Sequence, residues 1–330
     1  MNIKKKSKKK WWIIVCIPVV LLGLFVWAIG HFGPKYLNLY LFPPTVEGYG
    51  KLALERIDQN GLYAAGEEWQ EAYPALLAEL KTCTSYEDTY PVIERALAIG
   101  GGKHAFFCRP GEAAGGEAAG ESLSAAWLED GILTVSLPEF VGDAEAARAY
   151  AAPAQEFIHA HREEIRAAVV DLRDNTGGDL GPMLSAIAPL LPEGDLMYYH
   201  YRNYDLAVTL HEGELSYAGS GSYILYPEDK LEVPVAILVN ERTASSGEAA
   251  LLCFAGMESA RSFGAKTAGY TSVNMGYYLF DGAQMYLTVA EDMTREGEVF
   301  HNDPVEPDVP GAQPEQDALA WLKEQLGYLR

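Results

Sequence analysis

The structure of this chain is constrained most strongly by an uninterrupted apolar stretch, Trp11 to Gly30 (WWIIVCIPVVLLGLFVWAIG). Its twenty residues would form about 30 Å of helix, the thickness of a bilayer core. Tryptophans near both ends suit the two membrane interfaces, and six lysines in residues 1–10 predict a cytoplasmic tail. We therefore expect a single-pass anchor at 11–30 in the cell membrane, with the lipid bilayer as its partner and the remaining residues outside the cell.

A cleaved signal peptide is the alternative interpretation of this segment. Val26-Trp27-Ala28 loosely resembles a small-x-small cleavage site. The apolar run is long for the hydrophobic part of a signal peptide, so a retained anchor is preferred.

The residues after the lysine tail are strongly acidic. Six of the 25 basic residues lie in that tail, which leaves 19 against 46 acidic residues, a net charge near −27. Such a field repels nucleic acid and attracts cationic molecules, although solubility alone explains most of the charge. We expect no nucleic-acid partner.

The four cysteines form no dense disulfide framework. Cys16 and Cys253 are interpreted as apolar core residues, whereas Cys83 and Cys108 would be free to pair outside the cell, a choice that spacing does not decide. The sequence has no Cys-x-x-Cys and no His-Glu-x-x-His, so we expect no metal and no cofactor.

Residues 31–99 are predicted to form a small helical bundle. Apolar residues recur at three- and four-residue spacing in 46–63, 67–83 and 84–102, where three glycines end the last helix. Within 109–125, the Gly/Ala/Glu-rich stretch PGEAAGGEAAGESL predicts an exposed loop.

Predicted strands and helices alternate from Gly131 onward, which indicates an α/β core at 100–330 with helices on both faces of its sheet. The apolar runs AVVDLRDN (168–175) and VPVAILVN (233–240) are predicted to be buried strands of this sheet. The tyrosine-rich segment 197–226 predicts two or three antiparallel strands. Together with 109–125 it is expected to form a small loop- and β-rich cap.

Two serines, Ser245 and Ser246, stand between a predicted strand and a predicted helix. Unpaired backbone N–H groups and the dipole at a helix N-terminus favour a developing negative charge. The glycines of the turn segment DLRDNTGGDL at 171–180 would let backbone approach a substrate closely. A nucleophilic serine is one interpretation, and a helix cap formed by Thr243 or either serine is the more frequent one.

Four segments, taken in order, resemble the tail-specific, or C-terminal processing, serine peptidases. They are AVVDLRDNTGGDL (168–180), VPVAILVNERTASSGEAA (233–250), GAKTAGYTSVN (264–274) and NDPVEPDVP (302–310). Each is a weak signal alone, but the four in order are specific and cover about Gly100 to Leu326. The resemblance implies a hydrolase of peptide bonds with a ClpP/crotonase-like α/β peptidase core.

By this resemblance Ser245, which follows Thr243-Ala244, is the nucleophile. The N–H groups of Ser246 and of either Gly177 or Gly178 would form an oxyanion hole, in which one donor is worth about 3 kcal/mol. Substrate contacts are expected for three residues of the motifs, Thr243, Ala244 and Tyr270.

Three further residues have expected supporting roles. Glu248 matches the family's glutamate. It would orient the base or bind a substrate amine, or it is simply an acidic residue that the helix dipole favours in the first turn. Asp171 and Arg173 are expected to hold the glycine turn as a buried pair.

The general base is expected to be a histidine. The family's housekeeping branch has a lysine where this chain has Tyr270, and Lys266 lies four residues too early to match. In the nisin-resistance branch a Gly-x-x-His segment supplies a histidine, which corresponds to His104 in GGGKHAFF. Imidazole can accept the proton and return it to the leaving amine. His301 is the alternative base.

Taken together, the resemblance implies a monomeric, membrane-anchored extracellular serine endopeptidase that cleaves near the C-terminus of a peptide such as a lantibiotic. One alternative is a processing protease for the cell's own exported proteins or peptides. Another is a non-catalytic peptide- or lipophile-binding module on the same fold, which would be expected to lack the serine or the histidine.

Overall fold

The computed structural model describes residues 6–37, 39–112, 123–217, 219 and 221–328. The chain divides into two compact units, Met1–Glu112 with Met275–Leu287, and Ala113–Asn274 with Thr288–Arg330. We call them the helical unit and the α/β unit. Residues 1–5 of the predicted tail and 113–122 of the predicted loop lie outside the described residues.

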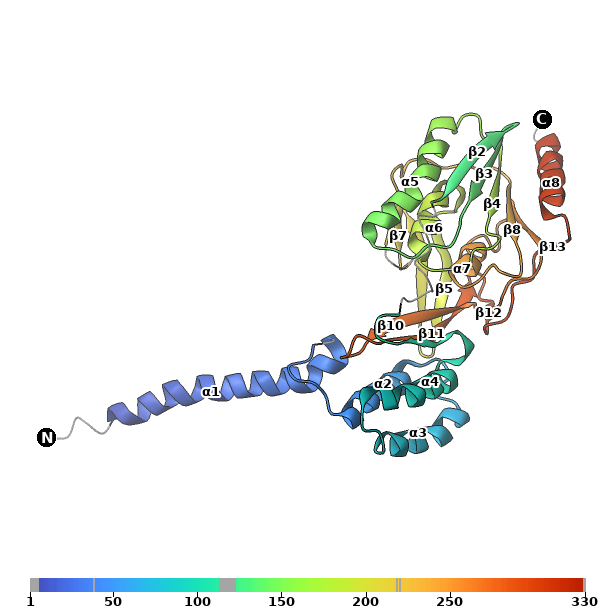
Figure 1. The fold of residues 1–330 in the computed structure, drawn as a ribbon. Coiled ribbons are helices and arrows are strands. Elements are labelled where there is room, and N and C mark those ends of the chain that lie inside the picture. The colour runs from blue at the N-terminus through green and yellow to red at the C-terminus, as the bar shows by residue number, and fades with distance from the viewer. Residues whose placement is uncertain (1–5, 38, 113–122, 218, 220, 329–330) are drawn as a thin grey trace. The chain divides into compact units, whose positions relative to one another are not determined.

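The helical unit contains the apolar helix and the three helices expected from apolar spacing (Figure 1). Their bounds are α1 Lys6–Phe32, continued by a π-helical turn Gly33–Leu37, α2 Val46–Asn60, α3 Glu67–Leu80 and α4 Tyr86–Gly100, followed by a 3-10 turn Gly102–His104. By length and composition, Ile17–Lys35 is able to cross a membrane.

Local sequence explains where these helices begin and how they pack. Ser85 caps α4, because its hydroxyl accepts a hydrogen bond from the Asp88 N–H (3.2 Å) while the Asp88 carboxylate accepts one from the Ser85 N–H (3.0 Å). Trp69 of α3 is fully buried and its indole N–H donates to Asp58 of α2 at 2.8 Å.

The helical unit also contains a late segment of the chain, although the sequence predicts this segment as part of the core. Strand β1 (Phe106–Cys108), which was not predicted, pairs with the first part of β11 (Gln284–Thr294). β11 follows β10 (Ser272–Tyr278) through a turn in which Asp281 accepts hydrogen bonds from the hydroxyls of Tyr49 (2.9 Å) and Tyr90 (2.6 Å). These long-range bonds explain why residues 275–287 join the helices.

The α/β unit is built on a six-stranded sheet of order β13-β9-β8-β4-β3-β2, in which only the β2–β3 pair is antiparallel. The strands are β2 Ala125–Glu129, β3 Ile132–Ser136, β4 Ala167–Asp171, β8 Val235–Val239, β9 Ala260–Gly264 and β13 Val309–Pro310. β8 is buried at every residue, as its continuous apolar run predicted.

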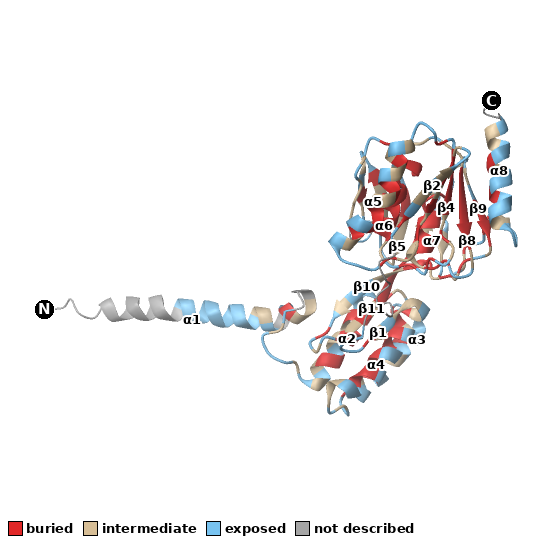
Figure 2. Ribbon diagram, turned by 45° about the horizontal axis from the view of Figure 1, so that its top comes forward, coloured by how far each residue is buried: buried red, intermediate tan, exposed pale blue. Residues whose placement is uncertain are grey.

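Helices cover both faces of this sheet, which confirms the predicted layering (Figures 1 and 2). One face packs on α5 (Ala144–His161), α6 (Leu180–Ile187) and α7 (Ser246–Leu252), and the other on α8 (Pro314–Tyr328). Successive residues of one strand point to opposite faces of the sheet. Ile237 packs in the hydrophobic core beneath α5, α6 and α7, and Leu238 packs in the core beneath α8.

The tyrosine-rich segment forms three antiparallel strands, β5 (Gly194–Tyr201), β6 (Asp205–His211) and β7 (Glu214–Ser216). The antiparallel strands confirm that part of the prediction, while the cap that they would form with 109–125 stays a prediction. β5 pairs with the second part of β11, so they extend a sheet that also contains β12 (Val299–Phe300).

The cysteines outside the apolar helix carry free thiols. The pairing of Cys83 with Cys108, which the sequence left open, is not formed in this structure. Cys253 is fully buried at the end of α7, as expected for a core residue, and burial raises the pKa of its thiol well above the ordinary range.

Candidate active site

Ser245 is the residue at which the chain turns from the loop after β8 into α7. Its backbone has φ 53° and ψ −120°, a conformation that side-chain-bearing residues rarely adopt and that costs on the order of 1–3 kcal/mol. Strain of this kind persists only where the surroundings impose it, and it concentrates at functional sites. The backbone therefore distinguishes Ser245 from an ordinary helix cap.

The predicted glycine turn lies against Ser245. Gly177 has φ 110°, and a Cβ on it would lie 2.7 Å from the Ser245 Cβ. Gly178 has φ 105°, and a Cβ on it would lie 1.9 Å from the Phe140 carbonyl oxygen. The Ser246 hydroxyl donates to the Gly178 carbonyl at 2.7 Å. Both glycines are therefore required for this turn to contact the serine pair.

Hydrogen bonding separates the two glycines that the sequence left as alternative oxyanion donors. The Gly177 N–H already donates to the Asn175 side chain at 2.9 Å. Within the described part of the chain, the N–H groups of Gly178 and Ser246 have no hydrogen-bond acceptor. Gly178 is thus the glycine with a free donor. Asn175, fully buried and bonded to the Leu137 carbonyl at 2.8 Å, holds the turn and was missed by sequence reasoning.

Glu248 ties the serine loop to the third motif segment. Its fully buried carboxylate accepts hydrogen bonds from the N–H groups of Ser245 (2.9 Å), Gly269 (2.8 Å) and Tyr270 (2.7 Å), and from the hydroxyl of Thr267. Burial raises the pKa of Glu248, and these hydrogen bonds partly oppose that rise. With four protein donors around it, Glu248 fits a positioning role better than the binding of a substrate amine.

The three expected substrate-contacting residues differ in accessibility. The Thr243 side chain is fully buried, and its hydroxyl donates to the Leu172 carbonyl (2.9 Å) and accepts from the Asn240 N–H (3.1 Å). Ala244 is also buried. The side chains of Thr243 and Ala244 therefore lie inside the loop. Tyr270 is half-buried, and its contact with substrate stays a prediction.

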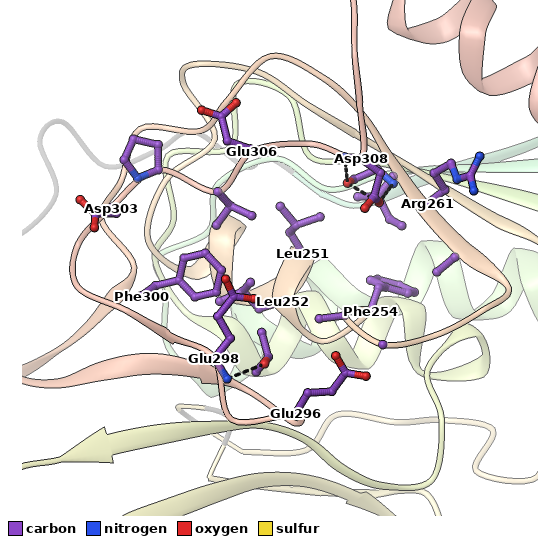
Figure 3. Close-up of a pocket in the computed structure, with 18 of the residues that line it drawn as sticks. Leu251, Leu252, Phe254, Arg261, Glu296, Glu298, Phe300, Asp303, Glu306 and Asp308 are labelled. Carbon is purple, nitrogen blue, oxygen red and sulfur yellow. Dashed lines mark hydrogen bonds between the residues drawn. The ribbon is translucent and has the colours of Figure 1, made fainter.

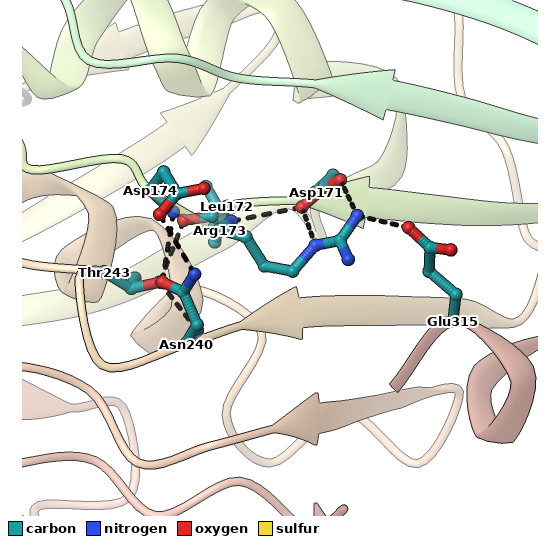
Figure 4. A network of polar contacts seen from close by, with 7 residues as sticks. All are labelled: Asp171, Leu172, Arg173, Asp174, Asn240, Thr243 and Glu315. Atoms are coloured by element: carbon teal, nitrogen blue, oxygen red, sulfur yellow. Dashed lines mark hydrogen bonds and ion pairs between the residues drawn. The ribbon is translucent and has the colours of Figure 1, made fainter. Parts of the chain in front are cut away.

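Asp171 and Arg173 form the expected pair at the end of β4 (Figure 4). The guanidinium donates to both carboxylate oxygens at 2.9 and 2.6 Å, and it also contacts Glu315 of α8 at 2.6 Å. The pair is half-buried rather than buried, because it lies at the C-terminal end of β4, where Arg173 also reaches Glu315. Asn240 accepts from the Asp174 N–H at 3.1 Å, which joins the ends of β4 and β8.

The candidate bases lie in different parts of the chain. His104 is half-buried at the end of its 3-10 turn in the helical unit, whereas Ser245 belongs to the α/β unit, and the role of His104 as the base stays a prediction. Four histidines of the α/β unit have a carboxylate partner, namely His159 with Asp229 (2.8 Å), His161 with Glu164 (3.0 Å), His200 with Asp205 (2.6 Å) and His301 with Glu291 (2.8 Å).

Asp292 of β11 is a second buried carboxyl group that sequence reasoning missed, because an acidic residue in a strand normally indicates an exposed position. It is 1% exposed, and its Oδ2 has no hydrogen-bond partner among the described residues. Burial, reinforced by the negative charge of Glu248, raises the pKa of Asp292 well above the ordinary range.

Asp292→Asn is expected to reduce the loss of stability that wild type shows as the pH rises. The unfolded-state pKa is about 3.9 and the folded-state pKa is higher, so the contribution of the neutral carboxyl is complete below about pH 4 and is lost as pH rises through the folded-state value. Each pKa unit between the folded and the unfolded state corresponds to about 1.4 kcal/mol in the free energy of unfolding. In urea unfolding at pH 5, 6.5 and 8, the free energy of unfolding should fall more steeply with pH for wild type and for the exposed-site variant Glu258→Gln than for Asp292→Asn. If the free energy of unfolding changed with pH in the same way in all three proteins, Asp292 would not contribute to the pH dependence.

A pocket of about 500 Å³ lies elsewhere in the α/β unit (Figure 3). It adjoins the C-terminal end of α7, with apolar side chains such as Leu251, Leu252 and Phe254 and an acidic border that includes Glu296, Glu298, Asp303 and Glu306. Ser245 begins the opposite end of this helix, and none of the predicted site residues lines the pocket.

Residues 131–310 match peptidase family S41. The chain is 32% identical over 309 residues to the nisin-resistance protein of Lactococcus lactis subsp. lactis, covering 93% of this chain and 96% of that protein. It is 28% identical over 172 residues to a probable CtpA-like serine protease of Staphylococcus haemolyticus, covering 52% of this chain and 32% of that protein.

Solved structures support the same relationship. A lipoprotein from Streptococcus agalactiae matches with a TM-score of 0.73 and 29% identity, covering 87% of this chain and 99% of that one. The photosystem II D1 C-terminal processing protease matches in fold, with a TM-score of 0.56 and 15% identity over 82% of this chain and 94% of that one. With its N-terminal helices, its α/β fold and the match across its motifs, this chain belongs to peptidase family S41 and is a serine peptidase.

Proposed function

We propose that this protein is a membrane-anchored extracellular endopeptidase that cleaves a cationic, lantibiotic-like peptide near its C-terminus. The observation that carries the catalytic part is Ser245, held in a strained backbone conformation against the Gly177-Gly178 turn. Similarity to the nisin-resistance protein over nearly the whole chain supports the substrate class. The net charge near −27 after the lysine tail would attract such a peptide.

In the proposed reaction the Ser245 hydroxyl attacks the scissile carbonyl carbon while His104 takes its proton. The N–H groups of Ser246 and Gly178 donate to the oxyanion that forms. His104 then gives the proton to the leaving amine, and the C–N bond breaks to leave an acyl-enzyme. Water, deprotonated by the same histidine, hydrolyses the acyl-enzyme and restores the serine. Glu248 acts through the backbone of Ser245 rather than on the substrate.

Mass spectrometry of the products of the full-length protein in lipid nanodiscs tests this function. Nisin and a linear cationic peptide of equal length would be incubated with wild type and with Ser245→Ala. Release of a short C-terminal fragment from nisin by wild type alone is expected. Cleavage of only the linear peptide would favour a processing protease with another target, and cleavage of neither would contradict the proposed substrate class.

The assignment of the base predicts unequal effects of two histidine substitutions. His104→Ala should lower kcat/KM by about 10²–10⁴-fold, the usual contribution of a general acid–base. His301→Ala should change it by less than about tenfold, although His301 has Glu291 as a carboxylate partner and shares a unit with Ser245. Both rates come from one fluorogenic peptide assay across pH 5–9. A larger loss of kcat/KM in His301→Ala than in His104→Ala would assign the role of base to His301.

A further inference from the structure

The outer end of the apolar helix is fastened to the helical unit. The Pro34 carbonyl, within the π-helical turn Gly33–Leu37, accepts a hydrogen bond from Arg56 Nη2 at 2.7 Å. Arg56 is 5% exposed, and its Nη1 donates to the Tyr278 carbonyl at 3.0 Å while its guanidinium lies 5.3 Å from the Tyr277 ring centre. One buried arginine thus joins the end of α1, helix α2 and the end of β10.

The segment that leaves this turn is also held at both ends. The Leu39 N–H donates to the Gly33 carbonyl at 3.0 Å, which folds the chain back against the end of the apolar helix. At the other end the Pro44 carbonyl accepts a hydrogen bond from the Tyr86 hydroxyl at 2.6 Å, and the Tyr86 ring stacks on Tyr49 with centres 4.5 Å apart. The path of this segment is therefore determined by contacts.

Although it is held in place, this segment leaves large apolar side chains uncovered. Phe42 is 76% exposed, and the juxtamembrane patch, as we call it, consists of Leu39, Leu41, Phe42 and Phe280. Tyr40 links its two parts, because its ring centre lies 5.3 Å from that of Phe280 in the β10–β11 turn. Clustered exposed apolar side chains are typical of an interaction surface.

We infer that the juxtamembrane patch inserts into the outer leaflet of the bilayer that the apolar helix crosses. The inference rests on the proposed anchor. The candidate span ends at Lys35, and the Leu39–Gly33 hydrogen bond places the start of the patch level with that end. Headgroup regions extend about 5–8 Å beyond the hydrocarbon core, so side chains at this level meet the boundary between headgroups and acyl chains.

The bilayer fits this surface better than a protein partner does because the patch continues directly from the span. Lys35, whose Nζ lies 3.9 Å from Glu55, stands where a cationic side chain commonly extends toward lipid phosphates. Docking would hold the helical unit, which carries His104, at the membrane surface.

Photolabelling of the full-length protein in nanodiscs tests the inference. The nanodiscs would contain a lipid with a diazirine in its upper acyl chain, and the adducts would be mapped by mass spectrometry. Adducts are expected in Ile17–Lys35, at Leu39–Phe42 and at Phe280. Phe106 is the matched control, since it lies in the same unit and has the same 39% exposure as Leu41. It should carry at least fivefold less label.

Two results would overturn the inference in distinguishable ways. A labelled span with a patch labelled no more than Phe106 would refute docking and leave the anchor intact. An unlabelled span would refute both the anchor and the docking.

A variant separates lipid docking from substrate binding. Phe42→Ser combined with Phe280→Ser should lower labelling of the patch at least fivefold and leave kcat/KM for a water-soluble peptide unchanged, as should Phe106→Ser. A fall in kcat/KM with undiminished lipid labelling would show that the patch binds substrate instead.

Discussion

Ser245→Ala is expected to abolish peptide cleavage, with kcat/KM reduced by about 10⁴-fold or more, the scale seen when a serine nucleophile is removed. Neither of the two nearest hydroxyl-bearing residues in the described sequence should replace the lost hydroxyl, because Thr243 is buried with its hydroxyl bonded to Leu172 and the Ser246 hydroxyl is bonded to Gly178. Single-turnover assays with a fluorogenic peptide would measure the loss. The thermal midpoint should not fall, since alanine accepts the same loop packing.

Ser246→Ala is the matched control, because the two serines are adjacent and both half-buried. Its hydroxyl donates to the Gly178 carbonyl at 2.7 Å, whereas its proposed catalytic group is the backbone N–H, which alanine retains. We expect a loss of about tenfold at most, corresponding to one hydrogen bond that positions the turn. Equal losses in both variants would leave the nucleophile unassigned, and full activity in Ser245→Ala would exclude Ser245.

Glu248→Ala is expected to have the largest effect on stability, about 3–5 kcal/mol, because it leaves buried donors without an acceptor. Three of the donors are backbone N–H groups, those of Ser245, Gly269 and Tyr270. Loss of the bond to Ser245 should also relax its strained backbone and lower kcat by about 10²-fold, as small misplacements of reacting groups do. Urea unfolding should show a lower midpoint with an unchanged slope.

Two variants make the Glu248 result specific. Glu241→Ala removes an exposed carboxylate from the same loop and should change stability by less than about 0.5 kcal/mol. Glu248→Gln keeps one acceptor oxygen but brings an N–H₂ group toward the donors, so its effect should fall between wild type and Glu248→Ala. Wild-type stability in Glu248→Ala would show that water replaces the carboxylate.

Much of the fold follows from local patterns. Apolar spacing located the three helices between Val46 and Gly100, and continuous apolar runs identified β4 and β8 as strands buried on both faces. The serine and glycine motifs pointed to Ser245 and to the 177–178 turn, which lie in contact in the structure. The predicted helices and strands are confirmed because periodicity depends on neighbours a few residues apart, whereas the catalytic role of Ser245 stays a prediction.

Other features depend on contacts between distant residues and were not predictable. Asp281 is bound by tyrosines nearly two hundred residues or more away, and this places 275–287 with the helices. The choice between Gly177 and Gly178 depends on a bond to Asn175, and the burial of Thr243 depends on Leu172. Nothing near these residues in the sequence encodes such partners.

By itself the sequence determined the apolar helix, the order of strands and helices in the core, the family and the serine expected to react. Only the tertiary structure decided which glycine N–H is free, that Glu248 binds four donors, that Asp292 is buried, and that an exposed apolar patch lies at the end of α1. The physical reason is that periodicity and turn signals act over a few residues, whereas hydrogen-bond satisfaction and burial are set by whatever the folded chain brings alongside.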